Sequence, residues 1–175
     1  MSKRARWQRA GAIKLLDEAI AAAIGLPAAT VSGPEGTVNR GAASGAAGAA
    51  EVVRVFDPAT MQPDPARVVK VGGVAMFADF SPDGQWLYVP HQGDDHVSAI
   101  NTKTLELRDL ALPKQACLAA HALRVLSPQT AAVVCEGDHI SRKGTVVMLD
   151  LTSWSVRGFV EVGLFPDGLT RLPAL

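Results

Sequence analysis

Short apolar stretches separated by turn residues dominate the chain from residue 51 onwards. Within them side chains two positions apart would share one face of a strand, for example Trp86 with Tyr88 and Val97 with Ala99. This is the two-residue period of a strand that buries one face. The pattern therefore predicts a series of short β-strands over residues 51–175.

The first 50 residues have a different texture. Residues 10–26 carry apolar side chains three or four positions apart, which predicts a short amphipathic helix behind a basic N-terminus: Ile13, Leu16, Ile20, Ala23 and Ile24. Residues 27–50 are mainly Ala, Gly, Ser and Thr and cannot bury enough apolar surface to offset their ordering entropy. We therefore expect three parts: residues 1–26, a disordered linker over 27–50 that proteases cut first, and an all-β part over 51–175.

The all-β part repeats itself. Asp57, Asn101 and Asp150 each follow an apolar strand, at intervals of 44 and 49 residues. Pro82 and Pro128, each after a serine, are 46 residues apart. A period in the forties built from short strands is typical of β-propeller blades, each a four-stranded sheet.

The residues at these landmarks suit turns. In Ser81-Pro82-Asp83-Gly84 the proline has a fixed φ and the glycine tolerates a positive φ, which predicts a tight turn between two strands. An Asp or Asn after a strand can accept a hydrogen bond from the backbone two residues later. We therefore expect Asx turns at Asp57, Asn101 and Asp150.

These landmarks divide the chain into blades. We expect one strand, 52–56, to end an earlier blade, and a strand over 156–162 to open a later one. The two complete blades between them comprise 67–71, 76–80, 85–90 and 96–101, and then 107–112, 121–126, 131–136 and 145–151.

The repeat resembles the YVTN family of β-propellers. The matching motifs are Val71-Gly72, the Phe80 to Gly84 turn, Leu87-Tyr88-Val89, Val97 to Asn101 with Thr104, and Val162-Gly163 before Pro166-Asp167-Gly168. The resemblance implies a partial β-propeller of four-stranded antiparallel blades and a periplasmic or extracellular location. It implies no particular activity, because propellers host lactonases, electron-transfer subunits, cell-surface proteins and binding modules. In the second blade Gln129-Thr130 replaces Asp-Gly, which predicts a looser turn.

Charge and hydropathy exclude some classes of partner. Seventeen basic and seventeen acidic side chains cancel, so the chain has no overall electrostatic footprint for nucleic acid. No apolar run reaches the roughly 20 residues that span a bilayer. A signal peptide is poorly matched, because Asp17 and Glu18 interrupt the apolar stretch that follows the basic start. Cys117 and Cys135 have no spacing typical of a disulfide framework or a metal site, so we expect buried thiols.

The most distinctive polar feature is a set of histidines and acids in loops. On the expected strand order, the loops at 91–96 and 136–139 and the connection before His121 lie on one rim, which gathers all four histidines. The candidate ligand-binding residues are His91, Asp94, Asp95, His96, His121, Glu136, Asp138 and His139. Imidazole and carboxylate together can bind a divalent or copper-type metal, for which His91, His96 and His139 are the candidate ligands. The simpler interpretation is that these are solvated loop residues.

Two functions fit this pattern. The first is a non-catalytic propeller module that binds a protein, glycan or small ligand through its loop rim, without a cofactor and without catalytic residues. The alternative is part of a lactonase-like propeller enzyme or of a metal-containing electron-transfer subunit. Because rings need about four to eight blades, two blades predict self-association that completes a ring, or a longer gene product. A stable monodisperse monomer would contradict this expectation.

Overall fold

The computed structural model describes residues 28–32, 51–57 and 59–170, and these are all-β. The first sheet has the order β1-β2-β3, with β1 at Ala28–Ser32, β2 at Glu51–Phe56 and β3 at Pro63–Val71. It belongs mainly to one compact unit, which includes residues 53–68. The two sheets described next belong to a second unit, which includes residues 69–170.

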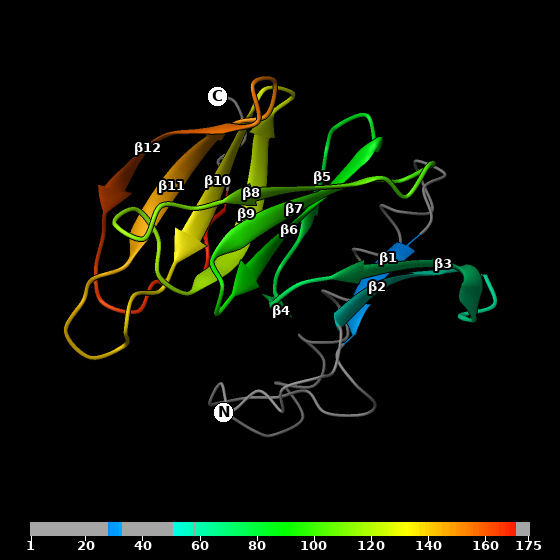
Figure 1. Ribbon diagram of the computed structural model, residues 1–175, viewed down its shortest axis with the longest axis horizontal. Helices are drawn as coiled ribbons and strands as arrows, with labels where there is room; N and C mark the ends of the chain where they lie inside the picture. The colour runs from blue at the N-terminus through cyan, green and yellow to red at the C-terminus, as the bar shows by residue number, and fades with distance from the viewer. Residues whose placement is uncertain (1–27, 33–50, 58, 171–175) are drawn as a thin grey trace, which may run out of the picture. The chain divides into compact units, whose positions relative to one another are not determined.

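The two sheets of the second unit are antiparallel and follow the chain order, one with five strands and the other with four (Figure 1). One has the order β4-β6-β7-β8, with β5 also paired to β6. Its strands are β4 (Val74–Ala75), β5 (Asp79–Phe80), β6 (Trp86–Gln92), β7 (His96–Asn101) and β8 (Leu107–Ala111). The other has the order β9-β10-β11-β12, formed by β9 (Ala120–Ser127), β10 (Thr130–Cys135), β11 (Thr145–Asp150) and β12 (Ser155–Glu161). Each sheet is one blade.

The strand pairing corrects the blade assignment by one strand. Residues 107–112 were expected to open the second blade, but β8 pairs with β7, from His96↔Ala111 to Ile100↔Leu107. Likewise β12 pairs with β11, from Thr145↔Glu161 to Asp150↔Ser155, and opens no further blade. The strand at 67–71 lies in β3 and pairs in the first sheet. The physical reason is that an Asx turn leads into a short hairpin loop, which returns the chain to the same sheet.

The two blades meet along β9. Phe77 and Ala122 form a parallel bridge, in which the Phe77 N–H donates to the His121 carbonyl at 3.1 Å and the Leu123 N–H donates to the Phe77 carbonyl at 3.0 Å. Oδ2 of Asp79 accepts a further hydrogen bond from the Val125 N–H at 2.9 Å. The two blades are therefore joined at this point by backbone and side-chain hydrogen bonds.

The hydrophobic core lies between the two blades. It joins one face of β6 and β7 to one face of β9, β10 and β11 through the connection after β8. Its buried members are Tyr88, Val97, Ala99, Leu112, Ala116, Cys117, Ala120, Leu123, Ala131, Val133, Cys135, Val147 and Leu149. As predicted, Trp86 packs against this core beside Tyr88, Val97 and Ala99. The opposite faces of β6 and β7 are buried as well, at Leu87, Val89 and Ile100, so these strands do not bury one face alone. The rings of Tyr88 and Trp154 lie 5.8 Å apart.

All three predicted Asx turns are present. Oδ1 of Asp57, Asn101 and Asp150 each accepts hydrogen bonds from the backbone N–H groups two and three residues later. The residue four positions after each landmark has a positive φ: Met61 at 57°, Leu105 at 60° and Trp154 at 50°. The same backbone turn therefore recurs three times in the chain. The side chains of Met61, Leu105 and Trp154 do not indicate the positive φ that it requires.

We predict that Asn101→Ala lowers the free energy of unfolding by about 1 kcal/mol, because the N–H groups of Lys103 and Thr104 each lose a hydrogen bond of 3.0 Å. Asn101→Asp keeps the acceptor and should stay close to the parent protein. Urea denaturation of the three proteins tests this. Equal losses in both variants would contradict the role given to Oδ1.

The Ser-Pro-Asp-Gly turn forms as expected. The Gly84 N–H donates to the Ser81 carbonyl at 2.8 Å, and Gly84 has φ of 66°. The Ser81 hydroxyl donates to Oδ1 of Asp83 at 2.6 Å, and this hydrogen bond is the main cause that lowers the pKa of Asp83. The equivalent turn in the second blade connects β9 to β10 directly, with Thr130 paired to Ser127.

Two expectations from the sequence need correction. Cys117 and Cys135 are not thiols but form a disulfide, with Cα atoms 5.3 Å apart. The predicted linker at 27–50 contains β1, whose Thr30 and Val31 suit a strand. The rest of that segment and the predicted helix at 10–26 lie outside the described residues.

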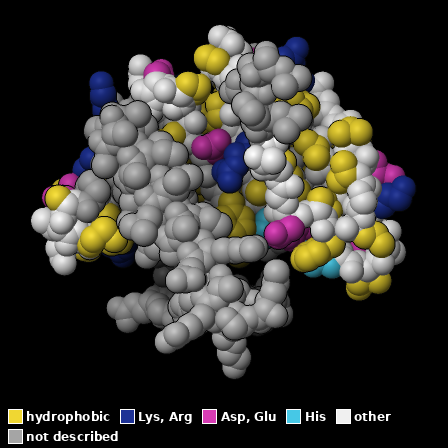
Figure 2. Space-filling model, turned by 180° about the vertical axis from the view of Figure 1, so that it is seen from behind, with side chains coloured by type: hydrophobic (Ala, Val, Ile, Leu, Met, Phe, Trp, Pro, Cys, Tyr) yellow, Lys and Arg dark blue, Asp and Glu magenta, His cyan; other side chains and the backbone are white. Residues whose placement is uncertain are grey.

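The described residues contain no helix long and apolar enough to cross a membrane. On the face that Figure 2 shows, acidic and basic side chains are scattered among hydrophobic ones and do not gather into one patch of either sign. This mixture agrees with the balanced charge of the sequence.

Candidate functional site

The histidines lie where strands of the two blades end at one edge. His91 pairs with His96 across the β6–β7 turn, and the end of β8 pairs with His96. In the next blade, the start of β9 pairs with Cys135 at the end of β10, next to Glu136. In the corrected strand order, the histidine loops connect the second strand of a blade to the third, or the fourth strand to the first strand of the next blade. These connections lie on the same rim, so the histidines are still together.

The centre of this edge is a group that we call the Glu136 cluster: Gln92, His121, Glu136, His139 and Asp167. The amide Nε2 of Gln92 donates to Oε2 of Glu136 at 2.7 Å, and Nε2 of His139 lies 2.8 Å from the same oxygen. Nδ1 of His121 lies 3.0 Å from the other oxygen, Oε1. Gln92 comes from one blade and Glu136 from the other, so the cluster spans the junction between them.

Glu136 is only 2% exposed, which is unusual for a carboxylate. Its backbone N–H donates to the Ala119 carbonyl at 3.0 Å, and the next residue, Gly137, donates to Leu118 at 3.0 Å. Gly137 has φ of 82°, and a Cβ there would lie 2.2 Å from the Arg142 carbonyl. Glycine at 137 therefore lets the loop turn back immediately after the buried carboxylate.

His121 is 9% exposed, and both of its ring nitrogens face carboxylates. Nδ1 faces Glu136, and Nε2 lies 3.2 Å from Oδ1 of Asp167. Neither contact has the direction of a hydrogen bond, so in the described part of the chain both nitrogens are buried without one. Buried polar nitrogens in this state are costly and call for an explanation.

Two aromatic rings border the cluster. Phe77 packs edge-on against His121 with ring centroids 5.1 Å apart, and Phe165 packs edge-on against His139 at 4.3 Å. Phe77 is 59% exposed and Phe165 is 50% exposed. The cluster therefore combines buried polar atoms with exposed aromatic surface.

A second group, the His91 cluster, lies in the first blade: His91, Asp94, His96, Ser98 and Asp109. The rings of His91 and His96 are stacked, with centroids 4.1 Å apart, and Nδ1 of His96 lies 3.0 Å from Oδ1 of Asp94. The Ser98 hydroxyl donates to Oδ1 of Asp109 at 2.6 Å and lies 2.9 Å from Nε2 of His91. Since its one proton goes to Asp109, Ser98 accepts from His91, whose proton is therefore on Nε2.

This proton arrangement differs from that of a catalytic serine. In a hydrolase triad the histidine accepts the serine proton, whereas here His91 donates to Ser98. Burial is the main cause that lowers the pKa of His91 to about 4, and the neighbouring His96 lowers it further. His91 is thus a neutral, fully buried imidazole with a structural hydrogen bond.

Two predicted site residues hold loops in place through backbone hydrogen bonds. Oδ1 of Asp95 accepts the Ala120 N–H at 3.0 Å, which ties the β6–β7 turn to β9. Oδ1 of Asp138 accepts the N–H groups of Ile140, Ser141 and Arg142 at 2.9, 2.8 and 2.7 Å. These backbone hydrogen bonds hold the pKa of Asp138 well below its usual range. Both carboxylates orient the loops that carry the clusters.

The structure therefore divides the predicted site residues. His121, Glu136 and His139 lie in the Glu136 cluster, while His91, Asp94 and His96 lie in the His91 cluster. The three metal candidates, His91, His96 and His139, are not brought together, because His139 is in the other cluster. Sequence reasoning missed Gln92, Ser98, Asp109 and Asp167. Gln92 directly follows a predicted loop histidine, and Asp167 lies in a motif that was noted only for its fold.

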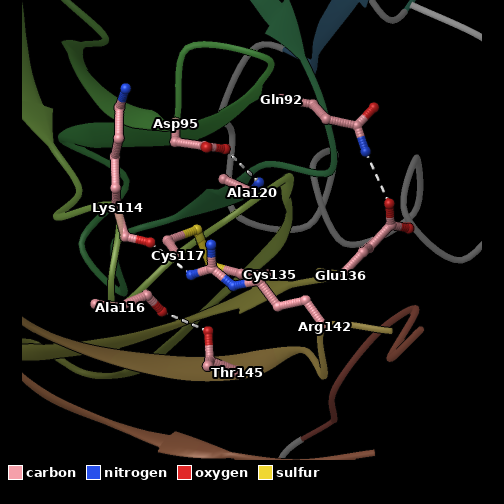
Figure 3. The surroundings of a disulfide bond; sticks show 10 residues. All are labelled: Gln92, Asp95, Lys114, Ala116, Cys117, Ala120, Cys135, Glu136, Arg142 and Thr145. Atoms are coloured by element: carbon pink, nitrogen blue, oxygen red, sulfur yellow. Dashed lines mark hydrogen bonds between the residues drawn. A yellow bond between two sulfur atoms is a disulfide. The ribbon is translucent and has the colours of Figure 1, made fainter. Parts of the chain in front are cut away.

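A disulfide lies next to the Glu136 cluster. Cys135 directly precedes Glu136, and Cys117 lies in the connection between β8 and β9 (Figure 3). The Thr145 hydroxyl donates to the Ala116 carbonyl of the same connection. In Figure 3 the side chains of Gln92 and Glu136 point toward one another beside this braced connection.

Comparison with known proteins supports the fold and leaves the function open. No family model matches the chain, and no curated protein matches its sequence. Among solved structures, it is similar to Kuenenia stuttgartiensis hydrazine synthase, with a TM-score of 0.57 and 18% identity over 66% of this chain and 31% of that one. It also matches the β-propeller domain of the trilobed protease from Pyrococcus furiosus, with a TM-score of 0.45 and 15% identity over 77% of this chain and 38% of that one.

The chain spans about a third of the length of each of these proteins. At 18% identity the first likeness concerns the fold alone, and the second is too weak to carry an argument. Over the described residues the chain is all-β, and it contains two neighbouring antiparallel sheets, one of four and one of five strands, that are arranged as β-propeller blades.

Proposed function

We propose that this chain is a non-catalytic section of a β-propeller that binds a small positively charged ligand at the Glu136 cluster. The observation that carries the proposal is the buried carboxylate of Glu136, which contacts the imidazoles of His121 and His139, groups that carry a charge only when protonated. Among the described residues, the ion pairs Lys143–Glu161 and Arg108–Glu106 lie elsewhere. A buried carboxylate is costly unless positive charge compensates it. A cationic ligand would supply that charge.

The surroundings of the carboxylate support a cation. Asp167 adds a second carboxylate whose side chain is 79% exposed. Phe77 and Phe165 present exposed rings next to His121 and His139. Aromatic faces beside carboxylates are a common way to bind organic cations. The cluster thus has an anionic centre, an exposed acidic group and aromatic borders.

The non-catalytic part of the proposal is supported by the His91 cluster. Its serine, Ser98, is buried and donates to Asp109, so its oxygen is not presented to a substrate. Turnover of a lactone that His91→Ala or His139→Ala abolishes would overturn this part of the proposal.

The binding part is tested with organic cations in the presence of EDTA. Arginine methyl ester, choline and spermidine are titrated into the full chain while amide shifts are followed by NMR. We expect saturable shifts at Glu136, Gly137 and Phe77, with Kd on the order of 0.1–1 mM, and at least a tenfold loss of affinity in Glu136→Gln. The control Asp94→Asn, which removes an acid from the His91 cluster, should bind normally.

The absence of saturable shifts for all three cations would overturn the proposal for organic cations, and the Zn²⁺ titration described below tests a metal cation separately. Equal affinity in Glu136→Gln and the parent chain would also overturn the proposal, because binding would then not depend on the buried carboxylate.

A further inference from the structure

Three residues of the Glu136 cluster bring possible metal-ligand atoms near one another. One atom from each of His121, Glu136 and Asp167 can be chosen so that all three lie within 4.8 Å of one another. Zinc holds nitrogen at about 2.0–2.1 Å and carboxylate oxygen at about 2.0–2.2 Å, which places tetrahedral ligand atoms roughly 3.4 Å apart. Asp167 is the exposed member of the three and can close the remaining distance.

The two oxygens of Glu136 have different surroundings. Gln92 and His139 both bind Oε2, at 2.7 and 2.8 Å. Oε1 faces His121 at 3.0 Å, in a contact that lacks hydrogen-bond geometry. Outer hydrogen bonds that fix a carboxylate and leave its second oxygen free are typical of metal sites. Oε1 is therefore oriented and has a free lone pair.

His121 provides an independent observation. It is a buried imidazole without a hydrogen bond at either nitrogen, placed between two carboxylates. A structural histidine usually has a hydrogen-bond partner. A metal ion bound to one of these nitrogens would give that nitrogen the partner that it lacks.

We propose that His121, Glu136 and Asp167 bind one divalent transition-metal ion, with Gln92 and His139 as the residues that position Glu136. This inference rests on the proposed function, because it names the cation that the cluster takes. One imidazole and two carboxylates suit Zn²⁺ or Mn²⁺ better than Ca²⁺, which prefers oxygen ligands only. Three protein ligands would leave a coordination position for water or for another ligand.

The proposal is tested by isothermal titration of Zn²⁺ into the untagged full chain, after treatment with EDTA and dialysis. We expect one equivalent to bind, with Asp167→Asn weakening Kd at least tenfold and His121→Gln at least thirtyfold. Asp167 is exposed, so its variant should fold even if a variant of the buried His121 does not. Asp94→Asn is the matched control and should bind as the parent does. Co²⁺ should give visible bands that are lost in the same variants.

Stoichiometric Zn²⁺ binding that both cluster variants leave unchanged would overturn the proposal, as would the absence of stoichiometric binding. The organic-cation titrations in EDTA separate this inference from the proposed function. If these cations bind and Zn²⁺ does not, only the metal inference fails. If neither binds, both fail.

Discussion

Replacing both cysteines with alanine, C117A/C135A, is expected to lower the free energy of unfolding by about 3 kcal/mol. The disulfide closes a loop of 18 residues, and a cross-link over a loop of this length removes about that much entropy from the unfolded chain. Both half-cystines are also buried in the core between the blades, so the substitution removes packing as well. Urea denaturation of the parent and the double variant measures the difference.

A reducing agent provides the control for this prediction. Dithiothreitol should destabilise the parent chain toward the level of the double variant and should leave the double variant unchanged. Equal stabilities of the parent and C117A/C135A in oxidising buffer would contradict the role given to the disulfide. The double variant should also bind Zn²⁺ more weakly. Glu136 directly follows Cys135, and its backbone N–H donates to the Ala119 carbonyl, so loss of the disulfide loosens the segment that holds this carboxylate.

The sequence predicted the strands better than their partners. Most strand positions and the Asx turns follow from local signals, such as the apolar run at Trp86 and the acceptor side chain of Asn101, and the structure confirms them. The strand expected at 76–80 is an exception, because the chain forms β4 at Val74–Ala75 and β5 at Asp79–Phe80 instead. Whether residues 107–111 pair backwards with β7 or forwards with β9 depends on the length of the hairpin that starts at Asn101. In that turn Leu105 has a left-handed backbone conformation, which could not be predicted from a leucine side chain.

The candidate site was also predictable only in part, because its residues are visible in the sequence but their contacts depend on the strand pairing. Loop histidines and acids were visible in the sequence, and the strand register gathers them at one edge. The composition of each cluster depends on which loop crosses to the neighbouring blade, as Gln92 does when it reaches Glu136. The disulfide could not be predicted because it depends on the strand pairing. Cys135 pairs with Ala120, which places the nearby Cys117 next to Cys135, and a separation of 18 residues in the sequence does not indicate this proximity.

Acid should destabilise the chain between about pH 6.5 and pH 4 through His91. This imidazole is fully buried, and burial lowers its pKa from 6.5 to about 4 in the folded chain. Between these values the unfolded chain binds a proton that the folded chain does not, so the free energy of unfolding falls as the pH falls. Each unit of pKa difference is worth about 1.4 kcal/mol, so the loss approaches about 3 kcal/mol at pH 4.

Two variants isolate this contribution. The groups that face His91 also include His96, Asp94 and Asp109; His96 disfavours a proton on His91, and the two carboxylates favour one. His91→Gln keeps an N–H donor for Ser98 and cannot take up a proton, so its stability should fall by about 2–3 kcal/mol less than that of the parent between pH 7 and pH 4. Ser98→Ala leaves the imidazole buried and should keep the steep dependence. Parallel stability curves for the parent and His91→Gln, or an imidazole NMR titration of His91 near pH 6.5, would show that this residue does not cause the acid sensitivity.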